Sequence, residues 1–271
     1  MKTLPTKMTD VIRHRKNLKR LIGSMEKRPF EFLPERSVDC LNQFFSGYQI
    51  FGPPVWRDLT SFEFWLEKRL SYPTDSGSRW YRYIQLNAKD RCDSFDLFCR
   101  LYRQYCRKNP IDVQPTAPEI MLGSSSFDFY KHLYAISKKP GMYMGSGDVV
   151  LIAAYLAGYF AGKKCAEVRL TPDENEFHRF GDWLRRHHKL DQQYPWYRLV
   201  EMWPRARNSL QGFFVEYDAF LTDFGKTARG LEDLFEVLSD SGSTTCRRRE
   251  KAPTELTVIA DSPMWWRAKR R

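Results

Sequence analysis

Cysteine side chains are the first residues in this sequence that could do chemistry, as metal ligands or as nucleophiles. Cys92, Cys99 and Cys106 recur every seven residues, which places them on one stripe of a helix with successive sulfur atoms ~10 Å apart. That separation is too long for one metal ion, whose bonds to sulfur are about 2.3 Å. None of the six cysteines belongs to a C-x-x-C pair. We therefore expect reduced thiols of a cytosolic protein that act as small apolar core residues.

Histidines are the second set of potential metal ligands. His178, His187 and His188 fall within one predicted helix. Two helical histidines share a metal ion when they are four residues apart on one face, whereas these are nine and one residues apart. We interpret the segment 185–188 as a solvated helix end, where cations interact favourably with the helix dipole. The sequence predicts no metal site and no cofactor.

Motifs of general enzyme classes are missing from the sequence. No G-x-S-x-G, P-loop, G-x-G-x-x-G or H-E-x-x-H pattern occurs. Acidic clusters such as Asp90/Asp93 and Asp173/Glu174 are typical of helix caps and first turns. We therefore expect no catalytic residues, and we predict that the protein is not an enzyme.

An internal repeat relates the two halves of the chain. Pro29 and Pro140 are 111 residues apart, and the same offset relates Gly47-Tyr48 to Gly158-Tyr159. Three further anchors follow in the same order: F-x-x-W-L in 62–70 and 180–188, W-Y-R in 78–84 and 194–200, and Leu97-Phe98 with Phe213-Phe214. The order predicts two tandem copies of one unit of about 100 residues. The recurring glycine predicts a close approach of helices.

Apolar residues recur at the spacing of amphipathic helices, so the predicted fold class is mainly α, with at most short β segments. The first unit spans 1–109 and begins with a basic helix, and a Pro-rich linker covers 110–126. The second unit spans 127–239, and a basic, disordered tail covers 240–271. We expect one short strand at Cys165–Leu170 and helices at 10–27, 38–48, 62–70, 80–86, 93–107, 127–137, 149–161, 174–188, from 196, 209–224 and 231–238.

The net charge of +11 lies entirely at the two ends of the chain. Residues 1–22 contain seven Lys/Arg and one acid, and residues 246–271 contain eight Lys/Arg and three acids. The body between them is neutral, whereas a folded nucleic-acid reader carries its excess charge on a structured face. The ends could bind phosphates or act as solubilising tails. No run of 18 apolar residues occurs, so we expect no membrane span and a cytoplasmic location.

Two short segments combine aromatic and polar residues and are the predicted binding elements. The W-Y-R triplets form either a stacking surface for nucleic acid, a protein hot spot, or core tryptophans with peripheral arginines. We predict a protein-binding surface in the cleft between the copies and on two nearby loops. Its residues are Met142, Tyr143, Asp148, Trp196, Tyr197 and Arg198.

The segment K-K-P-G-M-Y-M-G at 138–145 resembles the start of the ATP site of type II topoisomerase B subunits. Such ATPases need a Glu and an Asn on the helix after the motif, to activate water and hold Mg²⁺. The helix that follows here, V-V-L-I-A-A-Y-L-A-G-Y-F-A-G, contains neither residue. The resemblance therefore covers about eight residues and none of the chemistry, and we exclude an ATPase.

The whole pattern of K-P-G-M-Y-M-G, apolar helix, Gly-Tyr and F-x-x-W-L resembles a family of small uncharacterised bacterial proteins. Some of these are similar to immunity proteins that accompany secreted polymorphic toxins. The resemblance covers 134–224 well and 22–107 loosely, because Phe30–Pro34 lacks the Gly-Met-Tyr turn. It implies a cytoplasmic protein that binds and neutralises a toxin domain. The alternative hypothesis is a nucleic-acid-binding protein that uses its basic ends.

Overall fold

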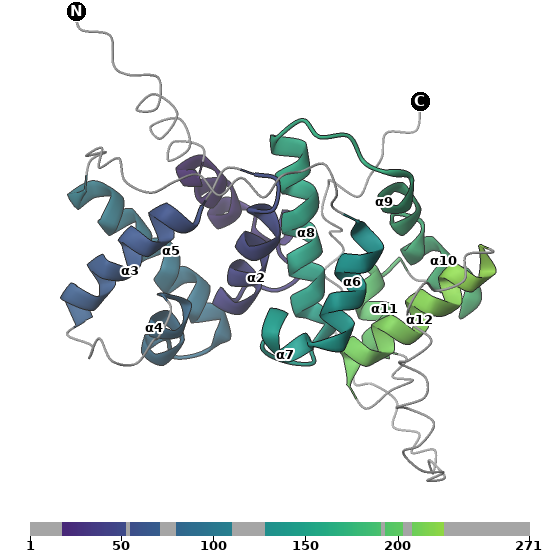
Figure 1. Ribbon diagram of the computed structural model, residues 1–271. Coiled ribbons are helices and arrows are strands. Elements are labelled where there is room, and N and C mark those ends of the chain that lie inside the picture. The colour runs from purple at the N-terminus through teal and green to yellow at the C-terminus, as the bar shows by residue number, and fades with distance from the viewer. Residues whose placement is uncertain are drawn as a thin grey trace, which may run out of the picture. The chain divides into compact units, whose positions relative to one another are not determined.

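The computed structural model describes residues 18–52, 55–70, 80–109, 128–190, 193–202 and 208–224. These residues are mainly helical and include no β-strand, as predicted for the fold class (Figure 1). The strand expected at Cys165–Leu170 is wrong, because the preceding helix runs to Cys165 and the chain then turns, with Glu167 at φ 57°. The predicted linker, the tail, the helix at 231–238 and the start of the first helix lie outside the described residues.

The chain packs into two compact units. Unit 1 consists of the described residues up to Asn109 together with Val150–Thr171, and unit 2 of Asp128–Val149 and the described residues from Pro172 onward. In unit 1, residues 18–27 are helical, and the elements that follow are η1 (Pro29–Glu31), α2 (Val38–Tyr48), α3 (Trp56–Leu70), α4 (Trp80–Asn87), α5 (Arg91–Lys108) and most of α8 (Val149–Cys165).

The described residues of unit 2 form six helices. They are α6 (Phe129–Lys138), α7 (Pro140–Tyr143), α9 (Pro172–Phe177), α10 (Phe180–His187), α11 (Trp196–Met202) and α12 (Ser209–Asp223). The single helix expected over 174–188 is wrong, because the chain leaves helical geometry after Phe177. The helix also starts two residues earlier than expected, because Pro172 takes the first helical position and Asp173 lies in the first turn.

Side-chain caps explain where several helices begin. Ser37 accepts a hydrogen bond from the Cys40 amide at 3.2 Å, and Asn208 accepts one from the Gln211 amide at 2.8 Å. Each side chain satisfies one amide that a helix start leaves without an intrahelical partner. Asp90 caps α5 in the same way, so this helix starts earlier than expected.

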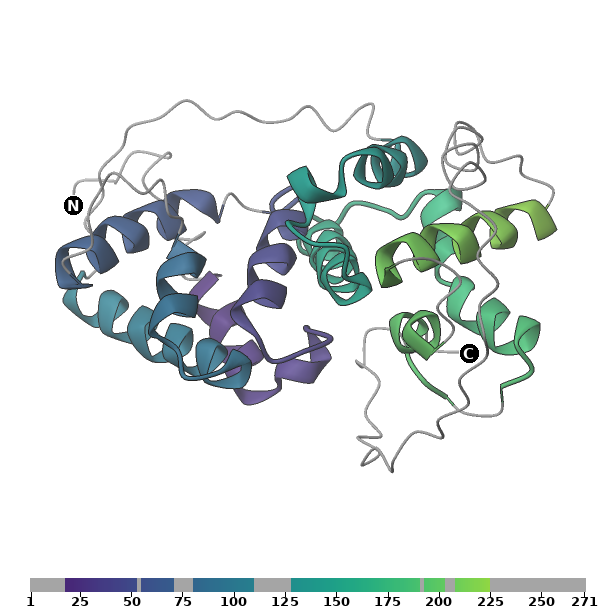
Figure 2. The same cartoon turned by 90° about the horizontal axis from the view of Figure 1, so that it is seen from below.

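Helices α2 and α8 pack so closely within unit 1 that only glycine fits at the contact. They lie side by side in both ribbon views (Figures 1 and 2). A Cβ atom built on Gly47 would lie 2.0 Å from the carbonyl oxygen of Tyr155, and one built on Gly158 would lie 1.9 Å from that of Phe44. Real Cβ atoms do not approach oxygen so closely, so the close helix approach predicted from the recurring glycines is confirmed.

The core of unit 1 is an aromatic cluster around Phe62, which is fully buried. Its ring meets those of Phe98, Tyr102 and Tyr105 edge-on, with centroid distances of 5.7, 5.5 and 5.5 Å. Trp80 packs on Phe98 at 5.0 Å. Edge-to-face pairs of this kind stabilise a core beyond the area that they bury.

The core of unit 2 is an aromatic cluster around Phe180, which is also fully buried. Its ring meets those of Phe213, Tyr217 and Phe220 edge-on, with centroid distances of 5.7, 5.4 and 5.5 Å. Trp196 packs on Phe213 at 5.0 Å. The ring geometry of the two clusters therefore matches pair by pair, with Phe213 in the place that Phe98 has in unit 1.

Candidate functional site

The turn after α6 in unit 2 holds three of the predicted binding residues in a defined conformation. Pro140 occupies the first position of the one-turn helix α7, and its carbonyl accepts a hydrogen bond from the Met144 amide at 2.7 Å. Met144 is only 2% exposed and anchors the turn in the core. Gly145 adopts φ 73°, a left-handed conformation that glycine reaches without steric cost. The Gly147 carbonyl then accepts a bond from the Leu210 amide at 3.1 Å.

The anchored turn presents one large apolar side chain to solvent. Met142 is 67% exposed, the highest value among the exposed large hydrophobic side chains of the described residues. Its neighbour Tyr143 is half-buried and packs edge-on against the His132 ring at 5.9 Å. Asp148 is half-buried directly before α8. The turn can therefore offer Met142 to a partner while its neighbours hold the backbone in place.

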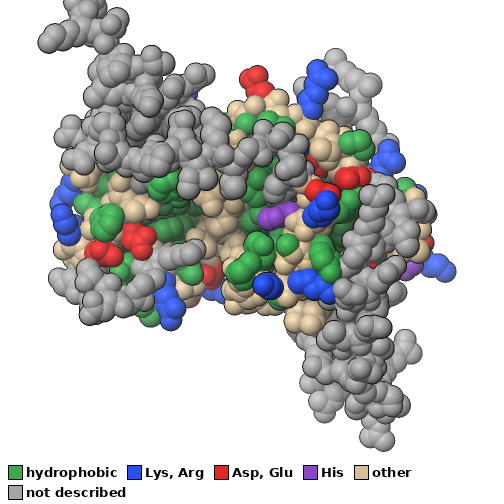
Figure 3. Space-filling view, viewed as in Figure 1, with side chains coloured by type: hydrophobic (Ala, Val, Ile, Leu, Met, Phe, Trp, Pro, Cys, Tyr) green, Lys and Arg blue, Asp and Glu red, His purple; other side chains and the backbone are tan. Residues whose placement is uncertain are grey.

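Lysines make the surroundings of this turn basic. Lys138 and Lys139 are exposed and lie at the end of α6, directly before the turn, whereas Lys131 lies at the start of α6 and is paired with Asp128 at 3.5 Å. The ammonium group of Lys138 lies 5.1 Å from the ring centre of Tyr134, within the range of a cation–π contact. On the face drawn in Figure 3, apolar side chains also reach the surface among charges of both signs. The turn thus combines an apolar tip with positive charge.

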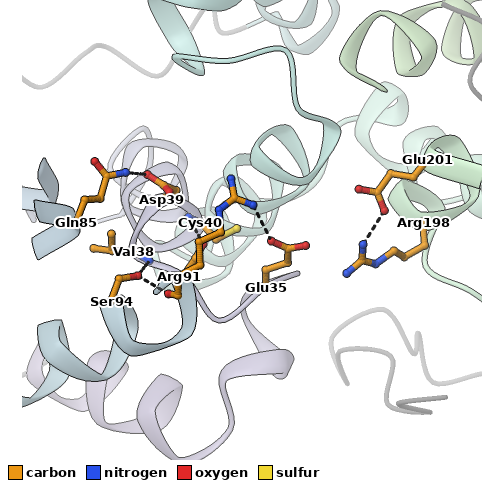
Figure 4. A network of polar contacts seen from close by, with 10 residues as sticks. Glu35, Val38, Asp39, Cys40, Gln85, Arg91, Ser94, Arg198 and Glu201 are labelled. Carbon is orange, nitrogen blue, oxygen red and sulfur yellow. Dashed lines mark hydrogen bonds and ion pairs between the residues drawn. The ribbon is translucent and has the colours of Figure 1, made fainter. Parts of the chain in front are cut away.

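The predicted binding triplet at α11 does not form one surface. Trp196 is only 6% exposed and belongs to the aromatic cluster, so its assignment to a partner-binding surface needs correction. Tyr197 and Arg198 are half-buried, and the Arg198 guanidinium bonds to Glu201 at 2.7 Å (Figure 4). This is the third of the three readings of the triplet, a core tryptophan with a peripheral arginine.

Polar contacts in unit 1 fasten helix ends rather than forming a reactive site. The Ser94 hydroxyl accepts a hydrogen bond from the Val38 amide at 3.1 Å, and Gln85 donates one to Asp39 (Figure 4). Burial raises the pKa of Asp39, while Arg91 and Gln85 oppose the shift. Unit 2 contains a similar helix-end contact, in which Ser209 accepts from the amide of the first residue of α8, at 3.0 Å.

The buried thiols are poor nucleophiles. Burial raises the pKa of Cys40 and of Cys99 to about 12, so both remain protonated at neutral pH. Cys99 fits its predicted core position, whereas Cys92 is exposed and does not.

One group of potential metal ligands was not predicted. The ligand atoms of His187, His188 and Glu216 lie within 4.8 Å of one another, and the His188 Nε2 atom lies 3.1 Å from a Glu216 carboxylate oxygen. The side chain of His188 is only 6% exposed, so 185–188 is not wholly a solvated helix end as expected. Glu216 was missed because it is 28 residues away on α12, and only the fold brings it to the histidines.

None of the helices in the described part of the chain has the length and apolar character needed to cross a membrane. No protein family, curated protein or solved structure matches the chain in our comparisons. The functional conclusions below therefore rest on the residues and their geometry.

Proposed function

We propose that this protein acts by binding another protein and that Met142 is a central contact of that interface. The observation that carries the proposal is the exposure of Met142 on a turn that is anchored directly after it, by the burial of Met144 and by the hydrogen bond to the Gly147 carbonyl. A preorganised turn loses little conformational freedom on binding, so more of the contact energy appears as affinity. Methionine is common at interfaces because its flexible thioether adapts to a partner surface.

The charge around the turn indicates the chemistry of the partner. Burial of one methionine side chain contributes about 1.5–3 kcal/mol, which alone does not give a stable complex. Lys138 and Lys139 supply positive charge directly before the turn. An apolar pocket rimmed by Asp or Glu on the partner would complement both features and accelerate association. In its most concrete form the protein is a non-enzymatic, cytoplasmic immunity protein, and the partner is a toxin domain.

We further propose that the chain derives from two tandem copies of one helical unit. The matching ring geometry around Phe62 and Phe180 supports this. The serine contacts support it as well, because Ser94 and Ser209 are 115 residues apart, as are Phe98 and Phe213. The glycine contacts of α2 and α8 are reciprocal at the repeat offset of 111, since Gly47 meets Tyr155 and Gly158 meets Phe44. This reciprocity is typical of a two-fold related pair.

Isothermal titration with a purified partner tests the binding proposal. Met142→Asp should weaken the complex by about a hundredfold, because the substitution places a charge in an apolar pocket and near acidic groups. Leu86→Asp is the matched control, since Leu86 is also large, apolar and 60% exposed but lies in unit 1. Equal affinity of the two variants and the wild type would contradict the assignment of Met142.

A second candidate function is nucleic-acid binding through the chain ends. It is favoured by the location of the whole net charge of +11 in residues 1–22 and 246–271. Such binding would weaken steeply with salt, because phosphate contacts release counterions. Removal of residues 1–20 and 246–271 would abolish it, whereas protein binding through Met142 would persist.

A further inference from the structure

We propose that His187, His188 and Glu216 form a binding site for one divalent transition-metal ion. Two imidazoles and one carboxylate are a known ligand set for zinc, with a fourth position left for water or another ligand. Imidazole nitrogen also favours the ions of the late first transition row over Mg²⁺ and Ca²⁺. The site is separate from Met142 and does not depend on the proposed partner binding.

The geometry is close to that of a bound site. The three ligand atoms lie within 4.8 Å of one another, and ligands of a tetrahedral zinc ion are about 3.3 Å apart. The His188–Glu216 pair is already at 3.1 Å. His187 is exposed at the end of α10, so a small movement of its ring closes the remaining distance.

The surroundings orient the exposed ligand. The His187 ring stacks on Trp183 with a centroid distance of 4.5 Å and stands edge-on to the His188 ring at 5.0 Å. The Trp183 indole in turn donates a hydrogen bond to Asp223 at 2.8 Å. A ring held in this way needs little reorganisation to accept a metal ion. The Trp183–Asp223 hydrogen bond therefore holds in place the ring on which His187 stacks.

The burial of the His188 and Glu216 side chains is the strongest indication that the three residues bind an ion. The Glu216 side chain is 0% exposed and that of His188 is 6% exposed. A carboxylate is costly to bury even when it is paired. An ion that binds both residues offsets this cost and uses the low dielectric of the site to strengthen its bonds.

The proposed first copy shows that the fold does not require polar residues at these positions. Leu70 corresponds to His188 when the two halves are aligned on Trp65 and Trp183. Leu101 corresponds to Glu216 when they are aligned on Phe98 and Phe213. Arg69 corresponds to His187, and its guanidinium lies over the Trp65 ring at 5.5 Å. This comparison rests on the proposed duplication. It indicates that two apolar residues of the unit are replaced by a histidine and a glutamate only in unit 2.

Metal titration of the untagged full-length chain tests the proposal. The protein is first stripped with a chelator, and Zn²⁺ and Co²⁺ are then added in separate calorimetric titrations. We expect one ion per chain, a visible absorption spectrum of four-coordinate Co²⁺, and a thermal midpoint that rises with zinc concentration. His187→Ala and Glu216→Gln should each weaken zinc binding by about tenfold or more.

Two controls separate loss of ligands from loss of folding. His188→Leu combined with Glu216→Leu copies the apolar pair of the first unit, so it should fold and bind no metal. His178→Gln removes another half-buried histidine of unit 2 and should bind as the wild type does. The proposal is overturned if the wild type takes up no ion, if the double-leucine variant binds as tightly as the wild type, or if Cys92→Ser alone abolishes binding.

Discussion

At Gly47 and Gly158 a hydrogen atom lies where any other residue would place a carbon atom. A Cβ atom added at either position would lie within 2.0 Å of a carbonyl oxygen of the facing helix. Gly158→Ala should therefore push α8 away from α2 and lower the free energy of unfolding by about 1–3 kcal/mol. Urea denaturation followed by circular dichroism measures the change.

Gly23 provides the control for this substitution. It lies in the helical segment 18–27, and no atom is within 4 Å of its built Cβ. Gly23→Ala should raise the free energy of unfolding by about 0.5–1 kcal/mol, because alanine loses less entropy in a helix. A destabilisation as large as that of Gly158→Ala would show that the close helix contact is not the cause.

His132 makes stability depend on pH. Burial lowers the pKa of His132 from 6.5 to about 4 in the folded protein. Between these values the unfolded chain binds more protons than the folded chain, so stability rises with pH and is lost on acidification from about pH 6.5 to 4. The slope contributed by His132 is at most about 1.4 kcal/mol per pH unit. His132→Gln should flatten the dependence measured by urea denaturation at pH 7, 6 and 5, and an unchanged slope would contradict it.

The exposure and the contacts of individual side chains were the features hardest to predict from the sequence. Met142 and Trp196 look alike in the sequence, because both are large apolar residues in polar segments, although Met142 is exposed and Trp196 is buried. Only the anchoring of Met144 and the packing of Trp196 on Phe213 separate them. The contact of His188 with Glu216 was hidden for another reason, since it joins two helices that no local spacing relates.

At the scale of the element, one serine in unit 2 holds the start of a helix in place. The Ser209 hydroxyl accepts a hydrogen bond from the amide of Val149, whose side chain is fully buried. Ser209→Ala leaves that amide unsatisfied and should cost about 1–2 kcal/mol of stability. Ser209→Thr keeps the hydroxyl and should cost much less. Equal losses in the two variants would show that the hydroxyl is not responsible.

The sequence predicts which segments are helical, and it predicts where a helix begins when a capping residue is present. The caps Ser37 and Asn208 can be recognised in the sequence, because each is a short polar residue directly before an apolar periodic run. The break after Phe177 was not recognised, since residues 174–188 keep helical periodicity through it. The strand expected at Cys165–Leu170 does not form, because the helix that begins at Val149 runs to Cys165 and the chain then turns at Glu167.

At the scale of the whole molecule, the two units predicted from the sequence differ from the two units into which the chain packs. The helix at 149–165 belongs to the predicted second unit 127–239, but from Val150 onward it packs in unit 1. Sequence order cannot reveal this, because an apolar helix can be buried by helices that precede it or by helices that follow it in the chain. The predicted boundary itself, 110–126, lies outside the described residues.

A truncation follows from this division. A chain that stops at residue 127 lacks α8 and exposes the face of α2 that contains Phe44 and Tyr48, both buried in the full-length protein. We expect it to lose the cooperative unfolding transition of the full chain, as followed by tryptophan fluorescence in urea. A sharp transition with an unchanged midpoint would show that α8 is dispensable to unit 1.

The central claim, binding of a protein through Met142, is tested most directly by affinity purification from the native host. The tagged full-length chain, Met142→Asp and Leu86→Asp are purified side by side at moderate and high salt, and the eluates are analysed by mass spectrometry and nucleic-acid staining. We predict one stoichiometric protein that remains at high salt on the wild type and on Leu86→Asp and is lost from Met142→Asp. Recovery of nucleic acid alone, released by salt, or retention of the same protein by Met142→Asp would contradict the claim.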